Sequence, residues 1–247
     1  MKKLIIALSA LYCFANACSS APEVTGNIDI YEDFQSKFIA SRSVRVWTPS
    51  DYDPQKKYDV IYMHDGQNLF DSSITWNSQE WGVDETLTRL MAEDRIRPCI
   101  VVGMDCGSLR YEEYYPSKIC QDIPEGCLPE GFTPLGDEYL RFIVEEVKPF
   151  IDGKYSTWGD AAHTFVSGSS CGGLISSYAL CEYPEVFSGA AGYDRTQEKI
   201  NEMIYMLEWP AADGREGYMY RFFPGHAHTE KDWNSRFEIP ILYLLAL

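Results

Sequence analysis

The sequence predicts a single α/β domain, built on a mostly parallel sheet with helices on both faces. Two observations lead to this prediction. Continuous apolar runs at residues 58–63 and 98–104, and at the start of 163–174, alternate with segments of helical spacing at 81–91 and 137–151. Strands buried on both faces are typical of parallel sheets, whose crossover connections are usually helices. At 247 residues the chain is long enough for one large core.

The expected elements follow in chain order. Alternation of polar and apolar residues predicts strands at 28–38 and 43–47, and a turn-rich link leads to strand 58–63. Helix 81–91 precedes strand 98–104, and a long irregular loop at 105–135 precedes helix 137–151. After the strand and helix within 163–183, we expect a weak strand at 186–193, a helix at 197–208, a strand at 217–223 and a last helix at 232–247.

The N-terminus has the pattern of an export signal. Lys2 and Lys3 precede an apolar run at 4–15, and a small-x-small cleavage signal ends at residue 17. We therefore expect a signal peptide at 1–17, a linker at 18–27 and an α/β domain at 28–247. Cys18 follows the cleavage signal directly, as in bacterial lipoproteins, where that cysteine carries the lipid anchor. The expected location is outside the cytoplasm, as a cell-envelope lipoprotein or as a periplasmic or secreted protein.

Charge and cysteine content limit the possible partners. The formal charge of −16 argues against binding to nucleic acid or to an anionic membrane surface. An exported chain with an even number of cysteines can form disulfides. The expected local disulfide joins Cys120 and Cys127. No cysteine or histidine cluster has zinc-ligand spacing, so we expect neither a metal nor another cofactor.

The sequence Gly168-x-Ser170-x-Gly172 has the spacing of a nucleophile elbow, in which a strand turns sharply into a helix and exposes one serine. The glycines let strand and helix approach closely. Ser170 would then stand at a helix N-terminus, where free N–H groups favour developing negative charge. This pattern predicts Ser170 as a nucleophile.

A serine nucleophile needs a base and an oxyanion hole. His226 and His228 lie in a late loop after a predicted strand, where the base falls when the triad runs serine, acid, histidine along the chain. One oxyanion donor should be the amide of Cys171, directly after the nucleophile. The other should come from residues 64–67, at the end of strand 58–63.

Several motifs in the same order resemble the esterase D and enterochelin-esterase-like group of α/β hydrolases, which is also similar to the family 1 carbohydrate esterases. They lie at residues 63–71, 81–86, 101–105, 110–114, 168–173 and 228–233. The resemblance implies an α/β-hydrolase fold with Ser170 as nucleophile, His228 rather than His226 as base, and the amides of Gln67 and Cys171 as oxyanion donors. It also makes Arg110 and Tyr114 candidate substrate-binding residues. Trp81 is added as a third candidate, because an aromatic residue in or beside a predicted loop could stack on a sugar or aryl ring.

The segment after the elbow helix departs from this group. The family normally has two strand–helix units there before the last strand, whereas residues 186–218 have room for one. Asp194 closes the short strand at 186–193 and is the candidate triad acid; Glu198 and Asp213 are the alternatives.

The resulting hypothesis is an exported serine esterase that works through an acyl-enzyme. The expected substrate is a carbohydrate-linked acetyl or feruloyl group, or a siderophore ester. The alternatives are a non-catalytic or impaired protein on the hydrolase scaffold, which the shortened segment motivates, and an acyltransferase that uses the same residues. Oligomeric state is left open by the sequence.

Overall fold

A six-stranded sheet lies at the centre of the computed structural model, which describes residues 24–75, 77–120, 128–193 and 223–247. Its strands are β1 (Asn27–Phe34), β2 (Arg42–Thr48), β3 (Asp59–His64), β4 (Cys99–Met104), β5 (Thr164–Ser169) and β6 (Gly189–Tyr193). Their order is β1-β2-β4-β3-β5-β6. The last four strands of this order run parallel, and β2 pairs antiparallel with β1 and β4.

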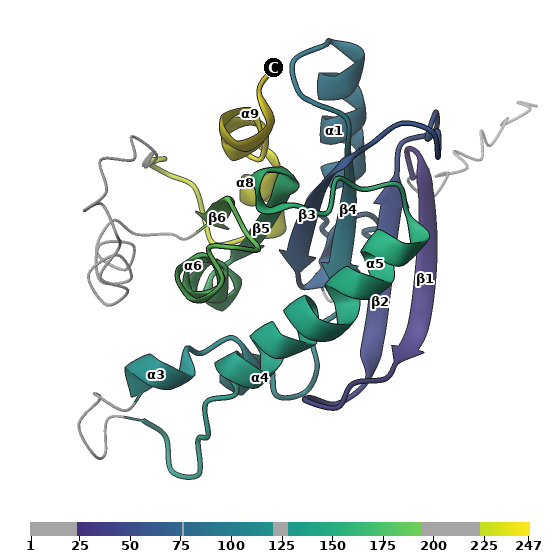
Figure 1. Ribbon diagram of the computed structural model, residues 1–247. Coiled ribbons are helices and arrows are strands. Elements are labelled where there is room, and N and C mark those ends of the chain that lie inside the picture. The colour runs from purple at the N-terminus through teal and green to yellow at the C-terminus, as the bar shows by residue number, and fades with distance from the viewer. Residues whose placement is uncertain (1–23, 76, 121–127, 194–222) are drawn as a thin grey trace, which may run out of the picture.

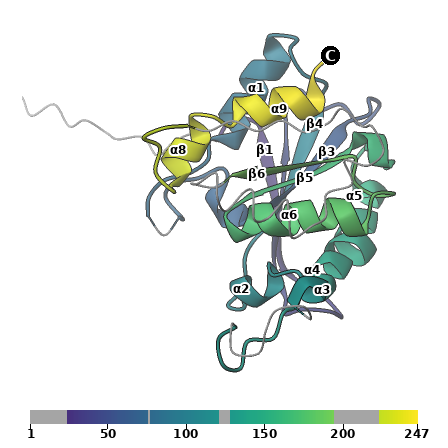
Figure 2. The same cartoon turned by 90° about the vertical axis from the view of Figure 1, so that its left-hand side faces the viewer.

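Helices cover both faces of the sheet (Figures 1 and 2). On one face lie α4 (Gly136–Arg141), α5 (Lys148–Lys154) and α6 (Cys171–Glu182). On the other lie α1 (Val83–Ala92) and α9 (Glu238–Leu245), with α8 (Glu230–Asn234) leading into α9. Two short helices, α2 (Arg110–Glu113) and α3 (Ser117–Cys120), follow β4. This arrangement confirms the predicted fold class.

The alternation of side chains along β3 divides the core into two layers. Val60 and Tyr62 belong to the apolar cluster beneath α4–α6, whereas Ile61 and Met63 belong to the cluster beneath α1 and α9. All four side chains are at most 1% exposed. Because β3 is buried on both faces, its sequence is a continuous apolar run, which is the property that identified it as a central parallel strand.

The expected helix at 137–151 is present but has a π-helical middle, Phe142–Val147, between α4 and α5. Pro149 lies in the first turn of α5. A proline has no amide hydrogen and its ring collides with the carbonyl one turn earlier, so the preceding turn must widen. The helix therefore continues through the proline instead of ending there.

Two other elements differ from expectation. The loop at 105–135 contains α2 and α3, and the single helix expected at 232–247 is two helices, α8 and α9. Pro240 explains the second difference, since a proline is tolerated in the first turn of a helix but not in its interior. None of the helices within the described ranges has the length and apolar character needed to cross a membrane.

Some expectations fall on residues outside the described ranges. These are the signal peptide at 1–17 and Cys18, the helix at 197–208, most of the strand at 217–223, and the part of the shortened segment that follows β6. Cys127 of the expected Cys120–Cys127 disulfide also lies outside them.

Candidate active site

Ser170 stands between β5 and α6, as the elbow spacing predicts. Its backbone has φ 55° and ψ −124°, a conformation that a residue with a side chain rarely adopts. The Ser170 amide donates to the carbonyl of Tyr193, at 2.8 Å, which ties the elbow to the end of β6. A strained conformation of this kind persists only where its surroundings hold it, so the chain keeps Ser170 at the sheet edge by packing.

The elbow glycines are required by close backbone contacts. A Cβ atom added to Gly168 would lie 2.8 Å from the carbonyl carbon of Gly172 and 2.8 Å from Cδ2 of His64. One added to Gly173 would lie 3.0 Å from Cα of Gly192 in β6. Strand, turn and helix therefore pack backbone against backbone, and this packing fixes the position of Ser170.

The predicted oxyanion loop lies at the same edge of the sheet as Ser170. β3 and β5 are neighbouring parallel strands, with Met63 opposite Ser167. After β3, Asp65 adopts a left-handed conformation (φ 57°) and a short 3-10 turn, Gly66–Asn68, begins. Gln67 lies in this turn. Cys171 is the first residue of α6, where amides lack an acceptor within the helix.

His64 lies buried between the oxyanion loop and the elbow. It is 1% exposed, and its Nδ1 is 2.8 Å from the hydroxyl of Tyr139. The pKa of His64 is lowered from 6.5 to about 3, because burial disfavours the charged ring and because Arg110 brings a like charge nearby. A neutral imidazole thus packs against the elbow glycines.

Arg110 and Tyr114 both contact Asp65. The Arg110 guanidinium donates from Nε and Nη2 to the two carboxylate oxygens of Asp65, each at 2.7 Å. The Tyr114 hydroxyl accepts from the Asp65 amide at 3.2 Å, and the guanidinium lies 4.9 Å from the centroid of the Tyr114 ring. The side chains of Arg110 and Asp65 are 24% and 8% exposed, so the guanidinium is partly open to solvent and the carboxylate is buried.

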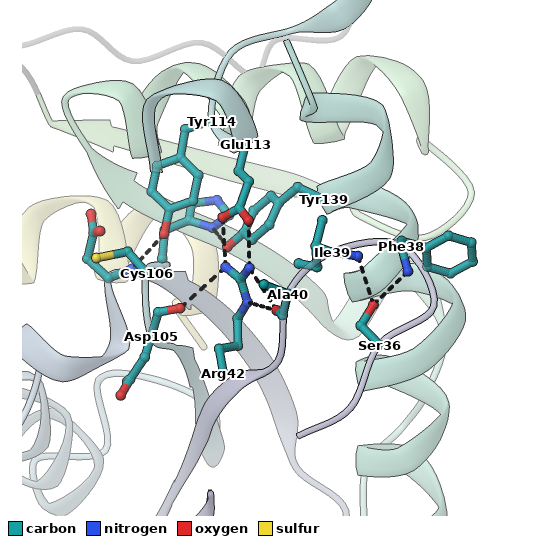
Figure 3. Close-up of polar contacts among 12 residues, drawn as sticks. Ser36, Phe38, Ile39, Ala40, Arg42, Asp105, Cys106, Glu113, Tyr114 and Tyr139 are labelled. Carbon is teal, nitrogen blue, oxygen red and sulfur yellow. Dashed lines mark hydrogen bonds and ion pairs between the residues drawn. The ribbon is translucent and has the colours of Figure 1, made fainter. Parts of the chain in front are cut away.

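A second buried ion pair holds α2 behind this site (Figure 3). The Arg42 guanidinium donates to both oxygens of Glu113, at 2.9 and 2.7 Å, and both side chains are 2% exposed. Arg42 also donates to the carbonyl of Ala40 and lies 5.7 Å from the ring centroid of Tyr139. Because the charges are paired and hydrogen-bonded, removing one partner alone would leave an uncompensated buried charge.

His228 lies in the segment that leads into α8. Its ring is exposed and meets the ring of Trp233 edge-on, with centroids 5.0 Å apart. Trp233 packs on Trp81 at 5.4 Å, and Trp81 packs on Tyr193 at 4.8 Å. These rings connect the end of β6, next to the elbow, with the His228 segment. His226, the alternative base, lies 3.7 Å from a carboxylate oxygen of Asp232.

The structure thus brings Ser170, Cys171 and Gln67 to one sheet edge, together with Arg110. It shows His228 against Trp233, and it leaves the candidate acids Asp194, Glu198 and Asp213 outside the described residues.

Two of the candidate substrate-binding residues lie inside the protein. Trp81 is 2% exposed within the core beneath α1 and α9, and Tyr114 is 0% exposed. Both are large aromatic side chains next to loops, and burial of their apolar surface outweighs exposure there. In this structure both side chains support the site from within the core, and direct substrate contact stays a prediction.

Sequence reasoning missed Arg42, Tyr139 and the role of Asp65. Arg42 meets Glu113 across 71 residues of sequence, and no local pattern pairs them. The position of Asp65 directly after a buried strand, followed by a glycine, was a usable signal, because Asp is one of the few residues that tolerate the left-handed region.

Comparisons with known proteins bear on the family and the fold. The family model described as "Putative esterase" matches residues 36–193. An uncharacterized protein of Bacillus subtilis, YbbA, is 25% identical over 171 residues, which are 65% of this chain and 62% of that relative. The chain therefore spans about three fifths of the length of this relative.

Two solved structures share the fold. The feruloyl esterase module from Clostridium thermocellum, complexed with sinapinate, has a TM-score of 0.58 at 18% identity and covers 89% of this chain and 88% of its own. The enterochelin esterase from Shigella flexneri has a TM-score of 0.59 at 17% identity and covers 92% of this chain and 60% of its own. At such identities the likeness shows the fold alone, and the family rests on the model that matches residues 36–193.

Proposed function

Because the chain belongs to the putative esterase family, we propose that it hydrolyses carboxylic esters through an acyl-enzyme at Ser170. One observation carries the proposal. Ser170 is held in a strained elbow at the carboxyl ends of the parallel strands, where the oxyanion loop after β3 also begins. A helix N-terminus and a neighbouring loop amide are the donors that acyl transfer needs, since they stabilise the negative oxygen of the tetrahedral intermediate.

The proposed reaction has two halves. His228 removes the proton of the Ser170 hydroxyl, whose oxygen attacks the ester carbonyl, and the amides of Gln67 and Cys171 donate to the resulting oxyanion. Collapse of this intermediate expels the alcohol, which takes the proton from His228. Water then attacks the acyl-enzyme by the same route and releases the acid. Asp194 is the proposed partner of the imidazole, with Glu198 and Asp213 as alternatives.

For the substrate, we propose an ester of a carbohydrate-linked acyl group, acetyl or feruloyl, or a siderophore ester. The names of the related structures, a feruloyl esterase and an enterochelin esterase, support these classes. Leu109 and Tyr111, on either side of Arg110, are 45% and 65% exposed and offer apolar surface beside the site. Such surface favours an aromatic acyl group over acetate, because a ring buries more apolar area.

We also propose that the protein acts outside the cytoplasm, after removal of residues 1–17, with residues 28–247 as its hydrolase domain. The N-terminal pattern of lysines, an apolar run and a cleavage signal supports export, and Cys18 is the proposed site of a lipid anchor.

Hydrolysis of aryl esters tests the proposed function. Purified protein should release the chromophore from short-chain and cinnamoyl-type aryl esters, and Ser170→Ala should reduce the rate to near the uncatalysed level. Equal rates for the two proteins would refute it. An alcohol acceptor added to the same reaction separates hydrolysis from acyl transfer, because a transferase would form the new ester as its main product.

A further inference from the structure

The oxyanion loop is held from one side by a single stretch of chain, residues 105–114, which we name the backing segment. It runs from the end of β4 through α2. Three of its side chains or amides reach the loop: Cys106 contacts Gln67, and Arg110 and Tyr114 contact Asp65. The resemblance suggested Arg110 and Tyr114 as substrate contacts, but these bonds are directed at the loop.

The unusual backbone conformation of Asp65 must be stabilised by its neighbours. Its φ of 57° is left-handed, and this conformation turns the chain from β3 into the 3-10 turn that carries Gln67. Rotation of Asp65 toward the commoner right-handed region would redirect every amide that follows. The Arg110 guanidinium fixes the side chain of Asp65 through both carboxylate oxygens, and the Tyr114 hydroxyl fixes its amide.

Gln67 is fixed through its own side chain. Its Nε2 donates to Sγ of Cys106 at 3.1 Å, and its Oε1 accepts from the Cys106 amide at 3.1 Å. The side chain amide therefore points back to the end of β4. Because both the nitrogen and the oxygen of this side-chain amide are hydrogen-bonded, the side chain of Gln67 has one orientation. We expect the direction of its backbone N–H to be fixed with it.

The loop also packs closely on β4 and on the elbow. A Cβ atom on Gly66 would lie 2.6 Å from the carbonyl carbon of Gly103 in β4, so the turn lies directly on that strand. His64 packs against the elbow glycine Gly168, whose added Cβ would lie 2.8 Å from the His64 ring. The position of the loop relative to Ser170 is thus set by packing below and by hydrogen bonds from the side.

We propose that Arg110, Tyr114 and Cys106 are positioning residues, which act through Asp65 and Gln67 to aim the Gln67 amide at the oxyanion. This inference rests on the proposed esterase function for its chemical meaning. It differs from substrate binding in what it predicts: loss of a positioning residue slows the chemical step, whereas loss of a substrate contact weakens binding.

The experiment compares Arg110→Gln with Arg97→Gln. Arg97 donates to Asp59 at 2.7 Å, and Asp59 is the first residue of β3, so the control removes an arginine–aspartate pair from the opposite end of the same strand. Both variants should unfold more easily. Arg110→Gln alone should lower kcat about 10- to 100-fold with KM within about threefold, since a displacement near 1 Å costs up to about 10²-fold.

Two further variants separate positioning from general damage. Arg110→Lys keeps the charge but not the two-pronged contact with Asp65, so its kcat should lie between those of the wild type and Arg110→Gln. Tyr114→Phe removes one hydroxyl and should lower kcat while KM stays the same. Phosphonylation of Ser170 by a fluorophosphonate should slow in parallel with kcat in every variant, because the phosphoryl oxygen occupies the same hole.

The results decide between the alternatives. A raised KM with unchanged kcat in Arg110→Gln would overturn the proposal and make Arg110 a substrate contact, and equal kcat losses in Arg110→Gln and Arg97→Gln would overturn it as well. If the wild type neither hydrolyses esters nor reacts with the phosphonate, the proposed function fails. The crystal structure of Tyr114→Phe then decides the positioning: displacement of Asp65 and Gln67 supports it, and an unmoved loop overturns it.

Discussion

Acidification should destabilise the protein through His64. The buried ring has a pKa lowered from 6.5 to about 3, so between these values the unfolded chain binds a proton that the folded protein refuses. Stability is therefore fully present above pH 6.5 and is lost as the pH falls toward 3. At pH 5, 1.5 units below the unfolded pKa, the loss is about 2 kcal/mol, at about 1.4 kcal/mol per unit.

Urea unfolding of wild type and His64→Gln at pH 5 and 7.5 isolates this contribution. The glutamine variant loses packing and the contact with Tyr139 at both pH values, but it cannot titrate. The advantage of the wild type over the variant should therefore shrink by about 2 kcal/mol between pH 7.5 and 5, with the denaturant slope m unchanged. A difference in unfolding free energy that stays the same at both pH values would refute the assignment of a neutral, buried His64.

Three further predictions are tested by thermal or urea unfolding, two at the elbow and one in α1. Gly168→Ala should lower the free energy of unfolding by about 1–3 kcal/mol, because its Cβ atom would lie 2.8 Å from backbone. Gly153→Ala is the control, since its Cβ atom would have no atom within 4 Å, and it should be neutral or stabilising. Equal effects of the two substitutions would contradict this. Ser170→Gly should be more stable than Ser170→Ala by about 1 kcal/mol, since glycine relieves the strained backbone, and the reverse order would remove the strain argument. Burial raises the pKa of Asp84 from 3.8 to about 7, so the contribution of this carboxyl falls as the pH rises through that window, opposite in sign to that of His64. The unfolding free energy of the wild type should therefore fall relative to that of Asp84→Asn over this window, and a constant difference would count against it.

Local patterns were enough to predict the elbow and the sheet. Gly168, Ser170 and Gly172 lie within five consecutive residues, so the sequence displays their spacing directly, although His64 also contributes to the contacts that require the glycines. The apolar runs of β3 and β4 likewise follow from burial on both faces of each strand. These features depend on a few consecutive residues, and a reading of the sequence can therefore find them.

Contacts across long stretches of sequence could not be predicted in this way. Arg42 and Glu113 meet only because β2 and α2 fold against one another, and nothing near either residue specifies its partner. Tyr114 and Trp81 were candidate substrate-binding residues, but an aromatic residue beside a loop suits both a binding surface and the margin of the core. Only the three-dimensional packing distinguishes these two environments, and in the structure it buries both side chains.

The central claim is that Ser170 is an activated nucleophile. Mass spectrometry of protein treated with a fluorophosphonate tests it most directly, with Ser170→Ala as the control. The claim predicts one phosphonyl group per chain, located on the peptide that contains Ser170, and no labelling of the alanine variant. Folded wild-type protein that remains unlabelled, or a label at another residue that persists in Ser170→Ala, would contradict it.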